Sequence, residues 1–542
     1  MWSNSWNRSL RRLNDGKMSA HAGESQSTIA SAISRRIKDL TAEPESTSAI
    51  WVLFGILFLV SVYRWAQFTH FAAPPGSDGG QWLAFGHQIL TGDDIKAGLD
   101  QYPPVIPFSV GVLERIVGAM LSLKLVGFAS SLVVAVPLHY LFRQILPWRL
   151  AVGLAVLPTL SPYHAEVLSF GGYPQLAGTG FLLMTLAALS HGIEHRSNRW
   201  LLVAGILTGL TVATHAMAVV GLVIAVPVVV ILAQLRVYGA VGGRHQQNLK
   251  PLVWWIVPGV LLTLPMVLVY SSYFLDSSPA PSGTPGLTYG KLFDFFDTGW
   301  RWESIFWLAA ATVSIGVLIS RIKLRGAVFE IAVALSLLAI VGILGLLELR
   351  FLEHMEVALV LWLGIAGSWA YSRWSSDQSA FRTLALFGVF LAVLLMLVLG
   401  HRRTLIAGDW YRVLDHQVIS GLDWLRVNGD ENARVASSPA LRGHNFSWWI
   451  EGYTHIQAYS ATEEFLIFEE EKRQGRQANR LLDVAVTVPE VEAIVAAENI
   501  QYVFLDREVV PVPPPGLLLA GFTTAYENDR VTVLGRPENQ DR

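Results

Sequence analysis

The chain has 542 residues, of which 52% are hydrophobic and 15% are charged, against about 25% charged residues in ordinary soluble proteins. This balance excludes a mainly disordered chain and an ordinary soluble enzyme, and the lack of cysteine excludes disulfides, thiolate metal sites and thiol catalysis. The net charge of −2 hides an asymmetry, because residues 401–542 hold 14 basic and 21 acidic residues whereas residues 1–400 are net positive.

The first 400 residues predict a membrane domain behind a polar tail. Residues 1–49 show no periodic apolar face and predict a mobile cytoplasmic tail. Residues 50–400 predict a transmembrane domain of about 11 helices, several shorter than the roughly 20 residues of a typical span. The short ones suggest a thinned or cavity-lined interior. The expected helices lie near 50–69, 123–142, 150–162, 175–192, 200–214, 217–234, 252–272, 304–320, 327–347, 352–371 and 382–400.

The distribution of basic residues predicts the orientation of these helices. With a cytoplasmic N-terminus, the five expected inner loops carry 12 Lys and Arg in 42 residues, and the four outer loops carry 5 in 102. Cytoplasmic loops are generally enriched in Lys and Arg. The outer loop 70–121 includes a stretch, 105–121, in which Glu114 and Arg115 are adjacent. Two charges in mid-bilayer are costly, so this stretch is expected to lie at the outer surface.

Residues 401–542 predict a small α/β domain on the extracytoplasmic side. Apolar periodicity and turn residues alternate between helical and strand-like stretches. Pro511–Pro515 interrupts this pattern before a final β-like stretch. The expected helices are Val418–Val427, Glu463–Leu482 and Val488–Glu498, and the expected strands are Ala433–Ser437 and Gln501–Leu505.

The most informative stretch is the start of the first outer loop, Ala73-Pro-Pro-Gly-Ser-Asp-Gly-Gly-Gln-Trp82. Asp78 lies among three glycines, which let the backbone approach a ligand closely. A carboxylate at the membrane surface is a candidate general base, and a solvated Asp in a turn is the alternative. Further along, Tyr102 opens a rigid Tyr-Pro-Pro turn that leads into the surface helix.

This arrangement resembles the GT-C superfamily of membrane glycosyltransferases. The shared features are one helix, a long outer loop with an acid just after it, a Tyr-Pro-Pro turn, many further helices and an outer C-terminal domain. The resemblance implies a polyprenyl-phosphate sugar donor and a catalytic or metal-binding role for Asp78. At the level of individual residues, the resemblance rests mainly on residues 74–107.

A second candidate acid is Glu166, in the expected outer loop 161–175, which has no Lys or Arg and contains Gly171-Gly172. GT-C enzymes often have a second acid in this loop, which implies a catalytic or metal-binding role for Glu166. Asp78, His164 and Glu166 could share a divalent cation such as Mg²⁺ or Mn²⁺. The alternative for Glu166 is a capping or surface carboxylate.

A phosphate leaving group requires cationic partners, and a guanidinium makes paired, charge-assisted hydrogen bonds to phosphate. Arg350 lies where one helix is expected to end outside and the next to begin. His354 follows one helical turn later, and His215 lies at the expected outer turn of the 200–234 hairpin. These three residues are the candidate donor-phosphate ligands. Snorkelling or pairing with a nearby glutamate is the alternative for Arg350.

Ser447-Trp-Trp-Ile-Glu-Gly-Tyr453 is similar to the Trp-Trp-Asp-Tyr-Gly signature of oligosaccharyltransferases, a GT-C branch. Ile450 and Glu451 depart from that signature, which argues against recognition of an Asn-linked sequon. Trp448, Trp449 and Glu451, together with Tyr102, are candidate acceptor or lid residues. The alternative is that the two tryptophans pack the outer domain onto the membrane.

The expected protein is therefore a multi-pass plasma-membrane, inverting glycosyltransferase acting at the outer face. Asp78 would be the base, the donor a polyprenyl-phosphate sugar, and the acceptor a glycan, lipid or protein. An oligosaccharyltransferase-like enzyme is one rival, and a non-catalytic scaffold or lipid transporter is another. No P-loop or GxGxxG pattern is present, so no nucleotide site is visible, and basic charge confined to inner loops does not indicate nucleic-acid binding.

Overall fold

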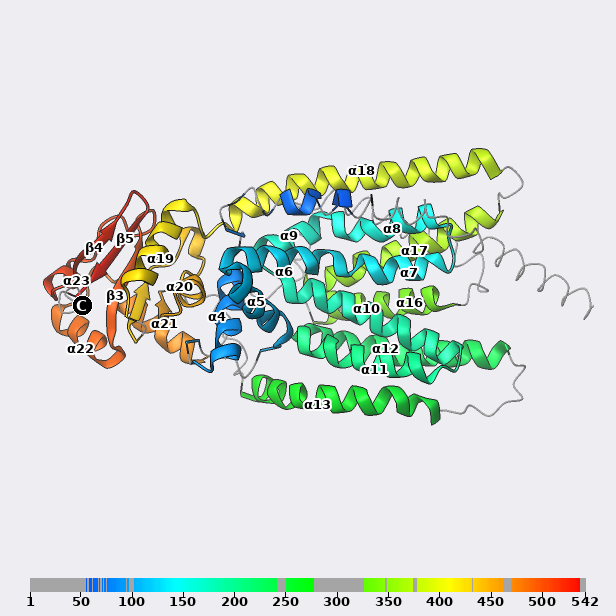
Figure 1. Cartoon of the computed structure of the whole chain (residues 1–542), viewed down its shortest axis with the longest axis horizontal. Helices are drawn as coiled ribbons and strands as arrows, with labels where there is room; N and C mark the ends of the chain where they lie inside the picture. The colour runs from blue at the N-terminus through cyan, green and yellow to red at the C-terminus, as the bar shows by residue number, and fades with distance from the viewer. Residues whose placement is uncertain are drawn as a thin grey trace, which may run out of the picture.

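The computed structural model describes residues 76–93, 102–240, 250–276, 326–346, 349–373, 378–430, 432–461 and 469–536, residues 95 and 96, and scattered residues between 55 and 74. Figure 1 shows two parts along the long axis, a helical bundle and a smaller mixed domain into which α18 leads. The expected tail 1–49 and the expected helix 304–320 lie outside the described residues.

The bundle consists of roughly aligned helices, with α13 and α18 at opposite edges (Figure 1). Its helices are α6 (Ala119–Val133), α7 (Ala135–Arg143), α8 (Trp148–Leu160), α9 (Pro162–Phe170), α10 (Tyr173–Glu194), α11 (Asn198–Thr214), α12 (Ala216–Ala240), α13 (Val253–Asp276), α16 (Ala327–Ile340), α17 (Leu352–Arg373) and α18 (Gln378–Trp410). Short turns add η2 (Lys250–Leu252), the π-helical η3 (Val341–Gly345) and η4 (Leu349–Phe351).

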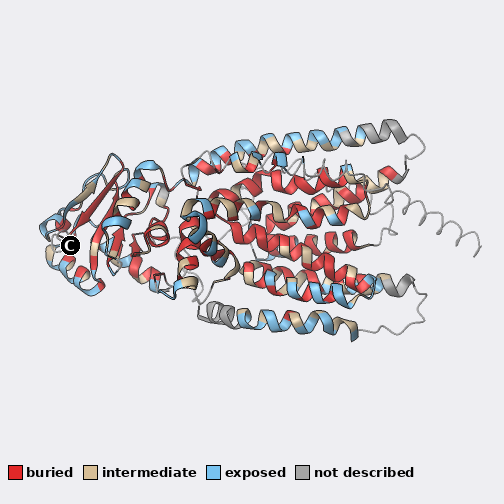
Figure 2. Cartoon of the chain, in the orientation of Figure 1, coloured by how far each residue is buried: buried red, intermediate tan, exposed pale blue. Residues whose placement is uncertain are grey.

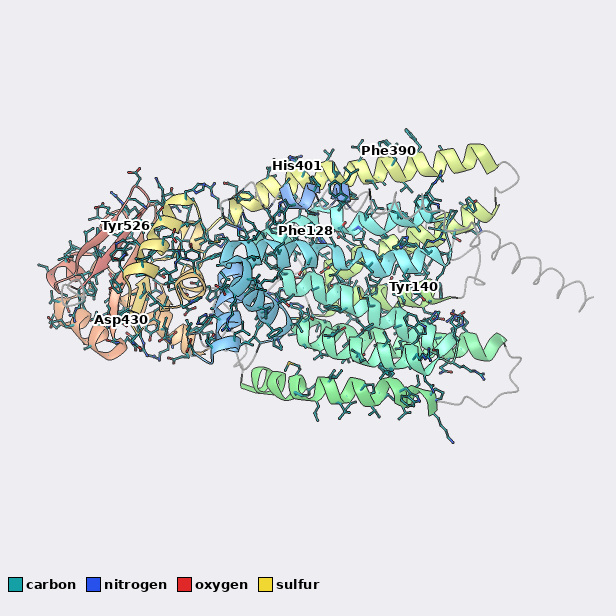
Figure 3. All side chains as sticks on the ribbon, in the orientation of Figure 1. Phe128, Tyr140, Phe390, His401, Asp430 and Tyr526 are labelled. Carbon is teal, nitrogen blue, oxygen red and sulfur yellow. The ribbon has the colours of Figure 1, made fainter. Side chains whose placement is uncertain are left out.

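Six helices of the described residues are long and apolar enough to cross a membrane. The central helices are buried, whereas α13 and α18 expose much of their length (Figure 2). The exposed side chains on these edge helices are largely apolar, such as Phe390, which projects outward from α18 (Figure 3). This confirms the prediction of a polytopic α-helical membrane protein. The count of about 11 spans stays a prediction, because 50–69 is described only in part.

Helix α8 corresponds to the expected helix near 150–162, whereas the expected outer loop 161–175 contains a further helix, α9. Helix α8 ends at Leu160, and α9 begins at Pro162 after Ser161, whose hydroxyl accepts the His164 backbone N–H at 3.1 Å. The last carbonyls of a helix have no partner within it. The fully buried Arg64 supplies a partner for one of these carbonyls, because its Nε donates to the Thr159 carbonyl oxygen at 3.0 Å.

Helices α4 (Asp78–Thr91) and α5 (Val105–Val117) lie at the end of the bundle next to the mixed domain (Figure 1). They cross where Gly86 meets Gly111, and a Cβ on Gly111 would lie 2.9 Å from the Gly86 Cα. The expected helix over 105–121 is thus present up to Val117, and residues 119–121 begin α6 after Gly118, whose φ of +82° ends α5. Glu114 on it lies 3.5 Å from His455 of the mixed domain, so this charge faces that domain.

The described residues of 411–536 form the mixed domain, around a five-stranded sheet of order β2-β1-β3-β5-β4. Strands β2, β1 and β3 are parallel, and β5 pairs antiparallel with both β3 and β4. The strands are β1 (Arg434–Ser437), β2 (Gln457–Ser460), β3 (Ile500–Asp506), β4 (Thr523–Glu527) and β5 (Val531–Gly535). The helices are α19 (His416–Asn428), the short η6 (Leu441–Gly443), α20 (Ser447–Thr454), α21 (Glu469–Leu481), α22 (Val488–Glu498) and α23 (Pro515–Leu519).

The central strand β3 is buried on both faces, as expected for a sheet covered by helices on each side. Tyr502 and Phe504 join the core shared with α19 and α20, whereas Val503 and Leu505 join a second core with α22. This alternation follows from the two-residue period of a strand. The expected α/β character of this domain is confirmed, whereas its extracytoplasmic position stays a prediction. The sequence pattern did not predict α20, β2 or α23.

The break in α8–α9 gives a stability prediction. Arg64→Leu removes the donor to the Thr159 carbonyl and is expected to lower the free energy of unfolding by about 1–3 kcal/mol. Thermal unfolding of the detergent-solubilised protein measures this. Arg402→Leu, which replaces an exposed arginine of α18, is the control and should leave the melting temperature nearly unchanged. Equal melting temperatures for the two variants would contradict the role of Arg64.

Candidate active site

The turn before Asp78 is fixed by long-range backbone contacts. The Gly76 N–H donates to the Tyr411 carbonyl oxygen at 2.9 Å, and the Gly76 carbonyl accepts the Trp449 indole N–H at 2.9 Å. Gly76 has φ +104°, which an L side chain rarely adopts, and a Cβ there would collide with the Phe170 backbone. Glycine is therefore required at this position.

The turn between α9 and α10 lies directly against Asp78. Gly171 has φ +94°, and a Cβ on it would lie 3.0 Å from the Asp78 Cβ. The Gly171 carbonyl accepts the Trp82 indole N–H at 2.8 Å, so helix α4 itself holds this turn. Asp78 is thus enclosed by two glycine turns that are far apart in the sequence.

Burial raises the pKa of Asp78 to about 6. The Ser77 hydroxyl, which donates to Asp78 Oδ1 at 3.1 Å, and the positive charge of Arg350 act in the opposite direction, because both favour the carboxylate. A carboxylate with a pKa near 6 is ionised at neutral pH and is a stronger base than an ordinary Asp. This is the range that suits a general base.

The three predicted phosphate ligands line one small pocket. Arg350 comes from η4, His354 from the first turn of α17, and His215 from the junction of α11 and α12. His354 is 4% exposed, and neither of its ring nitrogens has a hydrogen-bond partner among the described residues. The remaining lining residues are Gln175, Thr179, Met217, Ala218 and Phe351.

Arg350 links this pocket to Asp78. Its charge acts on both Asp78 and His215. The backbone of Arg350 is anchored from α10, since Gln175 Nε2 donates to its carbonyl at 3.3 Å and also to the Tyr163 hydroxyl at 3.1 Å. A carboxylate base and a cationic pocket are therefore neighbours.

The second predicted acid has partners of its own. Glu166 Oε2 accepts a hydrogen bond from Arg403 Nε at 2.5 Å, and Oε1 accepts one from the Tyr411 hydroxyl at 2.9 Å. Glu166 does not line the pocket. Sequence reasoning did not identify Arg403 or Tyr411, because both follow Glu166 by more than 230 residues.

The predicted cation ligands Asp78, His164 and Glu166 are not assembled. His164 is 1% exposed, and its ring lies near Arg64 and the Ser131 backbone. No group of three His, Asp or Glu within the described ranges could hold a metal ion. The donor set as it stands does not fit Mg²⁺ or Mn²⁺.

The predicted acceptor or lid residues lie in packed positions outside the pocket. Tyr102 stacks on Phe85 with ring centroids 5.5 Å apart. Trp449 is fully buried against Gly79, and Trp448 is 5% exposed. Trp449 thus packs onto α4, and both an acceptor role and packing onto the membrane stay predictions for the two tryptophans.

Glu451 belongs to a buried ion cluster at the junction of the two parts. Its Oε2 lies 3.8 Å from Lys96 Nζ, which also pairs with Glu471. Burial raises the pKa of Glu451 to about 8, although Lys96 favours the charged form. Lys96, which sequence reasoning also missed, thus joins the segment after α4 to α20 and α21.

Comparisons with known proteins identify the fold. No protein-family model matches the chain, and no curated protein matches it in sequence. A structure of the archaeal oligosaccharyltransferase AglB from Archaeoglobus fulgidus, in complex with an inhibitory peptide and a dolichol-phosphate, is similar over 91% of this chain and 75% of its own, with a TM-score of 0.51 and 14% identity.

ArnT from Cupriavidus metallidurans, bound to undecaprenyl phosphate, is similar over 90% of this chain and 98% of its own. The TM-score is 0.52 and the identity 13%. Both proteins are GT-C glycosyltransferases. The predicted resemblance to the GT-C superfamily is therefore confirmed at the level of the fold, and this chain is an integral membrane protein with that architecture.

The buried position of Glu451 gives a prediction about pH and stability. The pKa of Glu451 is about 8 in the folded protein and about 4.5 in the unfolded chain. Between these pH values the folded protein therefore binds one proton more than the unfolded chain does. The free energy of unfolding consequently falls as pH rises from about 4.5 to about 8. Glu451→Gln should flatten this fall, as followed by thermal unfolding at pH 5.5 and pH 8. The exposed Glu492→Gln is the control and should keep the wild-type slope. An unchanged slope in Glu451→Gln would contradict the prediction.

Proposed function

We propose that the protein is an inverting glycosyltransferase that moves a sugar from a polyprenyl-phosphate donor to an acceptor hydroxyl on the outer face of the membrane. The observation that carries this proposal is the neighbourhood of the Asp78 carboxylate and the pocket of Arg350, His215 and His354 within a GT-C fold. Two proteins of this fold bind dolichol-phosphate and undecaprenyl phosphate. The excess of basic residues in the expected inner loops supports the placement of Asp78 and the Arg350 pocket on the outer side of the membrane.

In the proposed reaction, Asp78 accepts the proton of the acceptor hydroxyl while that oxygen attacks the anomeric carbon. The bond from this carbon to the phosphate oxygen breaks, and polyprenyl phosphate leaves with the electron pair. Arg350 would stabilise the growing negative charge through charge-assisted hydrogen bonds. His354 and His215 would donate further hydrogen bonds from the pocket wall. In-line attack inverts the anomeric centre, and Asp78 then releases its proton to solvent.

A peptide acceptor is the second candidate. It is supported by the similarity to AglB, whose solved structures include one tethered to an acceptor peptide with the NVT sequon. The departures at Ile450 and Glu451, and the burial of Trp448 and Trp449, argue against sequon recognition of the same kind. A divalent-cation requirement would favour this candidate, although Asp78, His164 and Glu166 do not form a ready site.

The first test is sugar transfer by the purified, reconstituted protein from a panel of radiolabelled polyprenyl-phosphate hexoses and pentoses, with and without EDTA. Asp78→Asn is expected to lower transfer or donor hydrolysis about 10²–10⁴-fold, as for loss of a general base. Asp93→Asn, which changes an exposed Asp just after α4, should retain activity. Full activity of Asp78→Asn would contradict the assignment, and no turnover of any donor would favour a scaffold or transporter.

The pKa of Asp78 sets the expected pH dependence. The base acts only when ionised, so kcat/KM should fall tenfold per pH unit below about pH 6 and reach a plateau above it. Rates between pH 4.5 and 8 with a donor that turns over measure this. A profile whose acidic limb lies at the ordinary Asp value near 4 would contradict the raised pKa of the base.

A further inference from the structure

The contacts of Glu166 point to a role outside the chemistry itself. Both of its carboxylate oxygens are engaged, one by Arg403 and one by Tyr411. The Glu166 side chain is 16% exposed and that of Arg403 24%, so the pair is partly shielded from solvent and its charges compensate each other. Glu166 therefore has little left to offer a substrate or a cation.

The same contacts lead directly to the turn that carries Asp78. Tyr411 follows the end of α18, and its hydroxyl is held by Glu166 of α9. The carbonyl of Tyr411 accepts the Gly76 N–H, two residues before Asp78. The Tyr411 ring also packs edge-on against Phe170, whose backbone lies against Gly76. The Glu166 network, defined as Glu166, Arg403 and Tyr411, thus joins α9 and α18 to the Asp78 turn.

We infer that Glu166 is a positioning residue, which acts through Tyr411 to fix the backbone of Gly76 and hence the Asp78 carboxylate. This inference rests on the proposed function of Asp78 and replaces a direct catalytic role for Glu166. Displacement of a reacting group by about 1 Å costs on the order of a hundredfold in rate. Loss of one hydrogen bond of the network should therefore lower the rate by less than a hundredfold.

The kinetic test uses Tyr411→Phe and Glu166→Gln in the reconstituted protein. Each is expected to lower kcat about tenfold, with KM for the donor unchanged because the pocket of Arg350 is not altered. The double variant should be no slower than Glu166→Gln alone, since the Tyr411 hydroxyl acts on the Asp78 turn only through residue 166. The matched control is Tyr453→Phe, which removes another tyrosine–carboxylate hydrogen bond, to Asp423 at 2.8 Å, within the C-terminal domain.

A direct role for Glu166 gives a different result. Glu166→Gln would then lose as much activity as Asp78→Asn, whereas Tyr411→Phe would keep the wild-type rate. That outcome would overturn the inference. Size-exclusion chromatography and thermal unfolding of each variant identify a general loss of folding.

Hydrogen–deuterium exchange tests the inference without a known donor. Peptides covering 73–82 should exchange faster in Tyr411→Phe and Glu166→Gln than in wild type, whereas peptides covering β3 should not change. Tyr453→Phe should leave the exchange of 73–82 unchanged. Unaltered exchange of 73–82 in both network variants would overturn the inference. An active Asp78→Asn protein with faster exchange in the network variants would instead overturn the proposed function and leave the network in place.

Discussion

The pairing of the Gly76 backbone is the interaction on which the rest of the site depends. A turn at the end of a membrane bundle needs partners for its N–H and carbonyl groups, because unpaired buried groups are costly. Tyr411 and Trp449 supply them from positions more than 330 residues away. Bundle and C-terminal domain therefore meet at the residue that sets the position of Asp78.

This packing also determines the chemistry of the Asp78 carboxyl group. A solvated Asp would be a weak base at neutral pH, and a fully enclosed one without a cation would remain protonated. Burial raises the pKa of Asp78, while Ser77 and Arg350 limit the rise, so that the group is ionised at neutral pH yet basic. The arginine that would meet the leaving group thus also tunes the base.

How much of the fold and of the candidate site the sequence predicted depended on how far apart in the sequence the contacting residues lie. Local pattern located the α22 helix and the β3 strand to within a residue or two. The expected topology brought Arg350, His215 and His354 to the same side of the bundle, and the structure has them in one pocket. The partners of Glu166 could not be predicted, because no local pattern links a carboxylate of α9 to the end of α18. Arg64 was missed within an apolar run, where an arginine is itself a signal.

The break between α8 and α9 explains why the expected helix near 150–162 is shorter than a full span. Ser161 and Pro162 end one helix and begin another, which frees carbonyls within the bundle. Arg64 binds one of these carbonyls, and the Ser161 hydroxyl donates to Glu356 of α17 at 2.8 Å. These two polar contacts inside the bundle are thus a consequence of the break. The break in turn aims α9 so that Glu166 reaches Tyr411 and the turn after Phe170 reaches Asp78, which makes an irregular helix a structural requirement of the site.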